Sequence, residues 1–171
     1  MIYRIEGTDP HPLKLRMTGS CSVILFRDFM TSKRILPVNT NEELWECFPV
    51  IAQLRPALDI DTFITRVAIQ KSEGYTLVAL KDDTMVAAVA GFRFLHCLPL
   101  GKFMYVDDFV TDEQRRQGGI GALLFSWLEE HARQNVCSAI QLDSGIQREA
   151  AQQFYAAMKM EKTCNHFTKM L

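Results

Sequence analysis

The sequence lacks the features that mark a membrane protein or a metalloprotein. None of its apolar runs approaches the ~20 residues that a membrane-spanning helix needs, and no secretory signal peptide is visible. Its four histidines show no metal-ligand spacing, and its five cysteines are scattered, odd in number and without a close pair. The cysteine pattern argues against a disulfide framework or a zinc site and favours a reducing compartment. We therefore expect a cytoplasmic protein that holds no metal.

An excess of charge of one sign is also missing. The 19 lysines and arginines are offset by 20 aspartates and glutamates, which leaves a formal net charge of −1. This balance gives no overall electrostatic field for nucleic acid or an anionic membrane, so we expect neither as a partner. Basic residues gather mainly at one loop, which suits a local anionic ligand better.

The chain has enough apolar sequence for one good core. Of its 171 residues, 48% are hydrophobic and 23% are charged, which is ordinary for one soluble globular domain. Residues 1–33 are the least readable, although 21–26 could be a short strand. This N-terminal extension could be disordered, add an edge strand or contact a second subunit, as in a homodimer. Residues 34–171 carry regular patterns and are predicted to form a single domain.

Strands and helices are predicted to alternate within this domain. The early strands read as an antiparallel meander, and the strand, helix and strand between residues 103 and 142 form one parallel crossover, right-handed by general rule. The pattern predicts a mixed α/β fold, with a mostly antiparallel central sheet of six to seven strands and helices on both faces. The expected strands are residues 35–38, 75–80, 85–95, 103–110, 137–142 and 162–170. The expected helix N-caps are Thr40, Asp61 and, for the last helix, Asp143 or Ser144, and Pro49 limits or kinks the first helix.

The chain is organised around a strand, a glycine-rich basic loop and a helix start between Phe103 and Glu130. Residues 103–110 are rich in β-branched and aromatic side chains, as strands are. Three glycines in the loop let the backbone turn tightly and approach a ligand. The helix is predicted from apolar residues at helical spacing, which form one stripe. This stripe consists of Ile120, Leu123, Leu124, Trp127 and Leu128.

This loop has the physical properties of an anion site. The first amides of a helix have no partner within it and carry partial positive charge, and glycines leave them accessible. Arg115 and Arg116 add fixed positive charge. We therefore predict a cradle for a diphosphate, built from the amides of residues 117–122. A solvated turn that merely contains glycines and arginines is the simpler alternative.

Two other phosphate-binding motifs fit the loop less well. A P-loop would end in Gly-Lys-Ser/Thr, which is not present. A dinucleotide fingerprint is the nearer rival, because Gly119-Ile120-Gly121 supplies its first half and Asp143 lies at a plausible distance for a ribose contact. Leu124 stands at its third glycine position, however, and too little sequence follows for a repeated Rossmann unit.

The loop also resembles a specific family. Residues 116–121, Arg-Gln-Gly-Gly-Ile-Gly, fit the Arg/Gln-x-x-Gly-x-Gly/Ala motif of the GNAT superfamily of N-acetyltransferases. Residues 150–155, which end in Tyr155, resemble the last helix of that family. Residues 106–112, together with Leu142-Asp143-Ser144-Gly145 and Arg148, look like one bacterial subgroup of uncharacterised members. The resemblance covers about residues 34–171.

This resemblance implies an acetyl-CoA-dependent N-acetyltransferase that acts on a primary amine. Direct attack in a ternary complex is expected, because the sequence positions no cysteine as a covalent carrier. In the family, two parallel strands splay apart and admit the pantetheine arm of acetyl-CoA, which pairs with the free strand edge. That edge here is Asp108-Phe109-Val110. The implied cofactor-binding residues are Asp108, Phe109, Val110, Arg115, Arg116, Gln117, Gly118, Gly119, Ile120, Gly121, Ala122, Arg148, Phe154 and Tyr155.

The resemblance also suggests catalytic roles. Tyr155 matches the acid that protonates the leaving thiolate, and the backbone amide of Val110 is the expected oxyanion donor. The base is less clear. Asp107 and Asp108 are adjacent on a strand and are expected on opposite faces, and we favour Asp107, acting directly or through water. His166 is a second candidate.

Each of these residues has a structural alternative. Tyr155 could pack on the sheet, either aspartate could clamp the following loop, and His166 could be an ordinary strand histidine. In the family, the two early helices and the loop between them overlie the acceptor site, which makes Arg55, Phe48 and Phe63 candidates for shaping it. Core packing is the alternative for both phenylalanines.

Two departures from the family pattern stand out. Arg148 occupies about the place of a cofactor-binding asparagine, and it could instead meet a CoA phosphate or an acidic acceptor. Lys159-Met160 replaces the usual Gly-Phe after the tyrosine helix. The acceptor is unknown, and a non-catalytic CoA-binding regulatory module is the alternative function.

Overall fold

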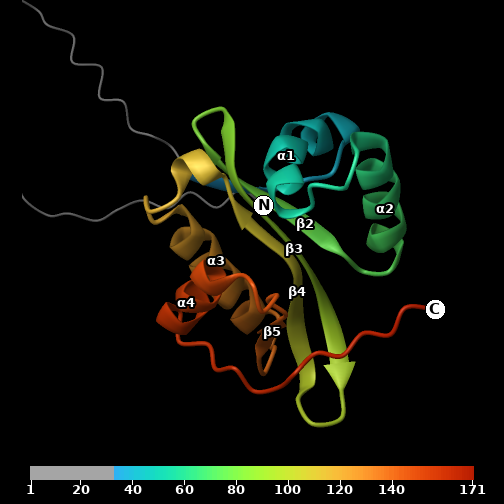
Figure 1. Ribbon diagram of the computed structural model, residues 1–171, viewed down its shortest axis with the longest axis vertical. Helices are drawn as coiled ribbons and strands as arrows, with labels where there is room; N and C mark the ends of the chain where they lie inside the picture. Colours follow the sequence, from blue (N-terminus) through green and yellow to red (C-terminus); the bar gives the residue numbers. More distant parts are fainter. Residues whose placement is uncertain (1–32) are drawn as a thin grey trace, which may run out of the picture.

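A computed structural model describes residues 33–171, which fold around one five-stranded sheet (Figure 1). The strand order is β1-β2-β3-β4-β5; the first four strands pair antiparallel, and β5 pairs parallel to β4. This confirms a mixed, mostly antiparallel sheet. The strands are β1 (Lys33–Pro37), β2 (Thr76–Asp82), β3 (Met85–Cys97), β4 (Gly101–Thr111) and β5 (Ile140–Leu142).

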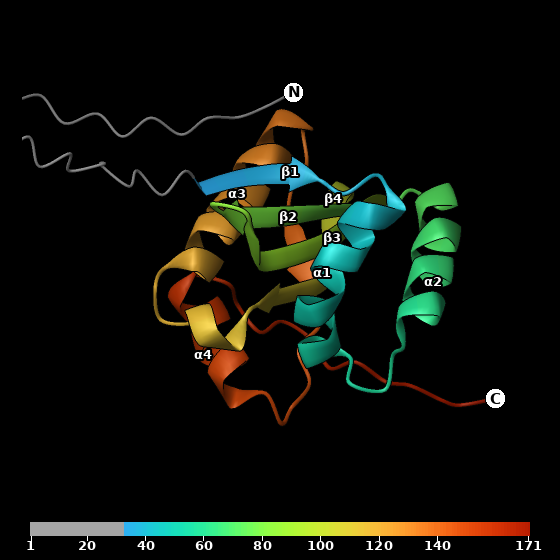
Figure 2. The same ribbon diagram turned by 90° about the horizontal axis from the view of Figure 1, so that it is seen from above.

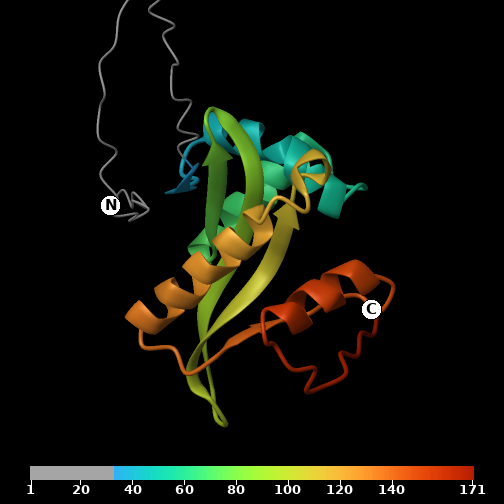
Figure 3. The same ribbon diagram turned by 90° about the vertical axis from the view of Figure 1, so that its left-hand side faces the viewer.

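Helices cover both faces of the sheet, as predicted (Figures 2 and 3). Helices α1 (Asn41–Leu54) and α2 (Ile60–Ser72) lie on one face, and α3 (Ile120–Gln134) and α4 (Glu149–Ala157) lie on the other. A short 3-10 helix, η1 (Glu113–Arg115), links β4 to the loop before α3. Within residues 33–171, every helix is too short or too polar to cross a bilayer.

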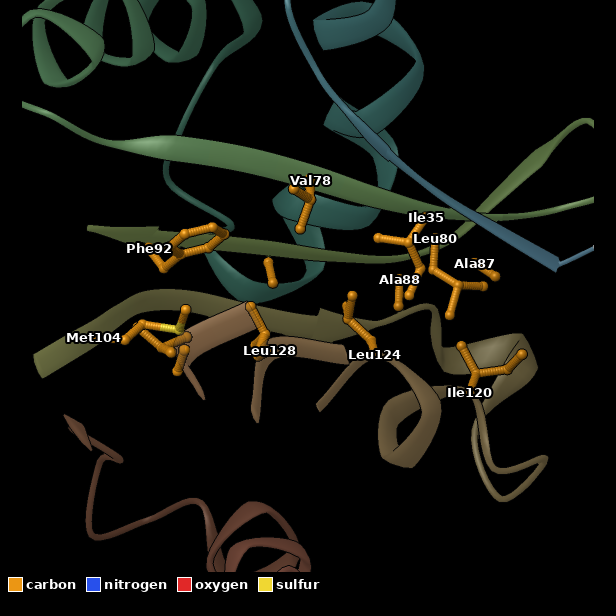
Figure 4. Close-up of a cluster of buried hydrophobic side chains, with 13 residues drawn as sticks. Ile35, Val78, Leu80, Ala87, Ala88, Phe92, Met104, Ile120, Leu124 and Leu128 are labelled. Atoms are coloured by element: carbon orange, nitrogen blue, oxygen red, sulfur yellow. The ribbon is translucent and has the colours of Figure 1, made fainter. Parts of the chain in front are cut away.

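The sheet separates two apolar layers. Phe92 of β3 and Met104 of β4 pack with the inner stripe of α3, which includes Leu124 and Leu128 (Figure 4). On the opposite face, neighbouring strand residues such as Val89 pack beneath α1 and α2. The central part of β3 is therefore buried on both sides, which its unbroken apolar sequence predicts.

Local capping signals explain how the early helices begin. Thr40 forms a capping box with Glu43, so its predicted role is confirmed. The cap of α2 is Asp59, whose carboxylate accepts from the Thr62 amide at 2.8 Å; the expected cap, Asp61, lies inside the first turn. Pro49 does not end α1, which continues to Leu54.

The C-terminal part differs from the expectation. Residues 162–170 form no strand and are exposed, so the predicted closing strand is wrong. The outermost strand, β5, has only three residues and offers too short an edge to hold another strand. The prediction of six to seven strands is thus not confirmed, and the short strand expected at residues 21–26 lies outside the described residues. Helix α4 begins after Arg148 without a side-chain cap, so neither Asp143 nor Ser144 caps it.

Candidate functional site

Half of β4 has an open edge beside β5. The parallel pairing joins residues 104–106 of β4 to 140–142 of β5, and it stops there. Beyond it, residues 107–111 of β4 keep their antiparallel partner β3 but have no described strand on the other side. The sequence predicted such a separation of two parallel strands through its resemblance to the family.

The direction of the backbone along this edge corrects one prediction. The N–H of Asp112 donates to Ala87 O of β3 at 3.0 Å. Because N–H and C=O groups alternate in direction along a strand, Val110, two residues earlier, also turns its N–H toward β3. Its amide therefore does not face the open edge as an oxyanion donor would. Phe109 and Thr111 carry the backbone groups that do face the edge.

A β-bulge places two acidic side chains together. Gly91 of β3 lies opposite Asp108 and Phe92 lies opposite Val106, so Asp107 has no partner. The extra residue breaks the alternation of the strand, which otherwise turns adjacent side chains to opposite faces. The side chains of Asp107 and Asp108 consequently both lie on the face covered by α1 and α2. The expectation of opposite faces was wrong because the bulge was not visible in the sequence of β4.

Asp108 is held by a tyrosine and an arginine. Its Oδ2 accepts from the Tyr75 hydroxyl at 3.0 Å, and its Oδ1 accepts from Arg55 Nη2 at 2.9 Å and Nε at 3.1 Å. The Tyr75 ring lies over Gly91, where an added Cβ would come within 1.8 Å of the phenolic oxygen. Both carboxylate oxygens are thus engaged, and Asp108 serves to position its neighbours.

Asp107 is less constrained. Its Oδ2 accepts from Arg93 Nε at 2.9 Å, and its other oxygen has no hydrogen-bond partner among residues 33–171. Burial raises the pKa of Asp107, although the Arg93 guanidinium works in the opposite direction. A partly buried carboxylate of raised pKa and one uncommitted oxygen has the properties of a proton acceptor.

Two cavities meet at this aspartate. The larger cleft, of about 1250 Å³, lies between α1, α2 and the sheet. The smaller slot, of about 200 Å³, lies between β4, β5 and α4. Their shared lining residues are Leu54, Arg55, Val106, Asp107, Asp143 and Gly145. A small group in the slot can therefore meet a larger molecule in the cleft beside Asp107.

Tyr155 lines the slot from α4. Its ring contacts the rings of Phe109 and Phe125, each with a centroid separation of 6.3 Å, and Phe154 stacks on Phe109 at 5.7 Å. Burial raises the pKa of the phenol, and the nearby charge of Arg148 partly offsets this effect. The phenol therefore keeps its proton at neutral pH and can donate it within the slot.

The start of α3 presents bare amides. Gly119 is the N-cap, with a left-handed φ of 75°, and no side chain caps the helix. Gln117, on the other side of Gly118, also has a positive φ, of 66°. Such an alternation is typical of turns in which successive N–H groups bind an anion. An added Cβ at Gly119 would meet nothing within 4 Å, whereas at Gly121 it would lie 3.1 Å from Thr111 Oγ1. The backbone is thus open to an anion at Gly119 and closely packed at Gly121.

The two arginines of this loop differ in their contacts. Arg115 Nη1 pairs with Asp82 Oδ2 at 2.9 Å, so part of its charge is already neutralised. Arg116 is exposed, and its Nε donates to Thr111 O at 3.3 Å, at the end of the open edge of β4. Of the two, Arg116 is the better placed for an added anion.

Arg148 does not point to this cradle. Its Nη2 donates to the carbonyl of Leu54 at 3.0 Å, and it lines the slot near Tyr155. This contact links the start of α4 to the end of α1. The structure thus offers a different role from the phosphate contact that the sequence suggested.

Asp143 and His166 lie together at the rim of the site. Asp143 Oδ2 accepts from the Tyr105 hydroxyl at 2.6 Å and contacts His166 Nδ1 at 2.9 Å. His166 lies on the irregular C-terminal segment and lines neither cavity. Among the described residues, no group of three or more His, Cys, Asp and Glu side chains could hold a metal ion.

Some residues of the site were not foreseen from the sequence. Tyr75 and Arg93 hold the two aspartates, yet Tyr75 lies just before β2, Arg93 lies on β3, and neither has a motif around it. Gly91 was the one available signal, because a glycine inside an apolar strand often marks a bulge or a close approach. Of the two expected acceptor-site aromatics, Phe63 lines the cleft but is buried, and Phe48 packs against it at 5.8 Å outside the lining.

Comparison with known proteins gives a consistent result. A family model described as the acetyltransferase (GNAT) family matches residues 38–160. The uncharacterized N-acetyltransferase YhdJ of Bacillus subtilis is 33% identical over 118 residues, which cover 68% of this chain and 83% of YhdJ.

Solved structures share the same fold. A GNAT family acetyltransferase of Staphylococcus aureus superimposes with a TM-score of 0.67 at 20% identity, covering 80% of this chain and 97% of that one. The aminoglycoside N-acetyltransferase AAC(6')-Iy in complex with CoA gives a TM-score of 0.70 at 13% identity, covering 82% and 96%. At these identities the two structures establish the fold alone.

Proposed function

The chain belongs to the GNAT family of acetyltransferases, and from this premise we propose that it transfers the acetyl group of acetyl-CoA to a primary amine. One observation carries the proposal. The slot beside the open edge of β4 contains Tyr155 and meets the larger cleft at Asp107. A thioester in the slot and an amine in the cleft would react at their junction.

The chain offers suitable groups for each part of the coenzyme. Backbone groups of Phe109 and Thr111 face the open edge, where they can pair with the amides of the pantetheine arm as a further strand would. The uncapped amides at Gly119 and the following residues, together with the Arg116 guanidinium, suit the diphosphate. When bound, the coenzyme supplies the acetyl thioester that reacts.

Two side chains would move protons in the transfer. Asp107 accepts a proton from the ammonium form of the acceptor, directly or through water, and frees the nitrogen lone pair. The nitrogen forms a bond to the thioester carbonyl carbon as the bond from that carbon to sulfur breaks. Tyr155 donates its phenolic proton to the departing sulfur. The nitrogen keeps one proton as the amide N–H and loses its surplus proton to solvent, from which the Tyr155 phenolate is protonated again.

We propose direct attack in a ternary complex. None of the cysteines within residues 33–171 lines the slot or the cleft, so this part of the chain offers no thiol in either cavity to carry the acetyl group between the two substrates. The large cleft admits acceptors of several sizes, and its lining does not single out one.

The cytoplasm is the compartment we propose, because the cysteines are scattered through the sequence.

The variant Tyr155→Phe tests this function. Loss of the phenolic proton donor should slow acetyl transfer about 10²-fold or more, while CoA binding persists, because the ring still fills its place. An amine found by screening acetyl-CoA consumption serves for the rates, and calorimetry measures CoA binding. An undiminished rate would remove Tyr155 from the mechanism. Tight CoA binding without acetylation of any amine in a broad panel would favour the CoA-binding regulatory module instead.

A further inference from the structure

The six residues that line both the slot and the cleft form the boundary between them, and they differ in character. Three of its six residues are charged, and each has at least one polar partner: Arg55 pairs with Asp108, Asp107 with Arg93, and Asp143 with Tyr105. Of the others, Gly145 has no side chain and Val106 is buried in the layer beneath α3. Leu54 remains as the one half-buried apolar side chain that lines both cavities.

Leu54 is held in place from two directions. It is the last residue of α1, and its carbonyl accepts from Arg148 of the α4 start at 3.0 Å. The next residue, Arg55, donates to Asp108 at 2.9 Å and to Asp107 O at 3.3 Å. These contacts tie the end of α1 to both walls of the slot. They therefore fix the backbone of Leu54 at the boundary.

From this geometry we propose that Leu54 limits the length of the acyl group that the protein transfers. The inference rests on the proposed function. Tyr155 lines the slot but not the cleft, whereas Asp107 lines both cavities. An acyl chain that extends from a thioester beside Tyr155 toward the acceptor therefore meets the boundary. On this proposal a methyl group stays within the slot, whereas a propyl group reaches the boundary and must displace Leu54 or enter the space of the acceptor.

The variant Leu54→Ala tests this limit on acyl length through the ratio of kcat/KM for butyryl-CoA to kcat/KM for acetyl-CoA. Calorimetry gives the affinities for acetyl-CoA, propionyl-CoA and butyryl-CoA, and initial rates give kcat/KM for each donor with one amine. Discrimination between chains that differ by a methylene reaches about tenfold in a fitted apolar pocket. We expect the wild type to prefer acetyl-CoA over butyryl-CoA by at least that factor, and Leu54→Ala to reduce the preference about tenfold or more.

The variant Leu58→Ala is the matched control. Leu58 lies on the connection that follows Leu54 and leads to α2; it is also half-buried, but of the two cavities it lines only the cleft. Its truncation should leave the butyryl-to-acetyl ratio as in the wild type. If Leu54→Ala does not fold, Leu54→Val removes one methylene and should shift the same ratio in the same direction.

The outcomes separate the inference from the function on which it rests. A wild type that binds and uses both donors equally, or a ratio unchanged by either Leu54 variant, overturns the role of Leu54 but leaves acetyl transfer intact. An equal shift in Leu58→Ala also overturns it, because the limit would then belong to the whole cleft. A wild type that binds none of the three donors overturns the proposed function, and this inference with it.

Discussion

Asp107 is the residue at which the two halves of the proposed site meet. It lines both cavities, and one of its oxygens accepts a hydrogen bond from Arg93. A bulge puts its side chain on the same face of the sheet as that of Asp108. Burial raises its pKa, and Arg93 limits that rise. Proton acceptance needs the ionised carboxylate, which exists above the raised pKa and is lost as the pH falls through it.

The raised pKa of Asp107 gives a prediction for the pH dependence of kcat/KM. The wild type should lose kcat/KM on the acid side at a pH above the usual titration range of an aspartate. Arg93→Gln should move that limb to higher pH, because the guanidinium that lowers the pKa is removed. Asp107→Asn should lower kcat about 10²-fold or more. An acid limb that stays in place in Arg93→Gln, or one that persists in Asp107→Asn, would assign the base to another group.

The sequence singled out residues that the structure brings near one another, but it did not give their orientation. Tyr155, Asp107 and the loop glycines could be named as candidates because each lies within a local pattern. The shared face of Asp107 and Asp108 could not, because it depends on the register between β3 and β4. The direction of the Val110 amide was misjudged for the same reason: it follows from pairing across strands.

The start of α3 is the element that should hold the diphosphate. Gly119→Val adds a branched side chain over the first amides, so CoA binding should weaken about tenfold or more, since hydrogen bonds to a charged group contribute ~1.5–3 kcal/mol each. Calorimetry with CoA measures the change.

A second glycine controls for backbone strain. Gly74, at the end of α2, also has a positive φ, of 89°, and nothing within 4 Å of an added Cβ. Gly74→Val should therefore strain the backbone similarly but leave CoA affinity unchanged. Equal affinities of Gly119→Val and wild type, or an equal loss in Gly74→Val, would speak against the cradle.

Elements with a strong local signal were predicted well. The strand, glycine loop and helix of residues 103–134 could be read from composition and periodicity, as could the β2–β3 hairpin. The closing strand at 162–170 could not be judged in this way, because a strand needs an edge to pair with. The sequence of β5 does not reveal that only three of its residues extend the sheet.

At the scale of the whole molecule, the fold brings two surfaces to one place. The α1–α2 pair closes the cleft on one face of the sheet, and α4 closes the slot on the other side of β4. Their meeting depends on β4, which pairs with β5 over only three residues and then separates from it. This early end of the pairing is the feature from which the proposed coenzyme site arises.

Amide hydrogen exchange at single-residue resolution tests this feature most directly. Measured by NMR with and without CoA, exchange at Phe109 and Thr111 should slow on binding, because their N–H groups face the open edge and the arm would pair with them. Exchange at Val110, whose N–H faces β3, should change little. Unchanged exchange at both Phe109 and Thr111 under saturating CoA would contradict the account.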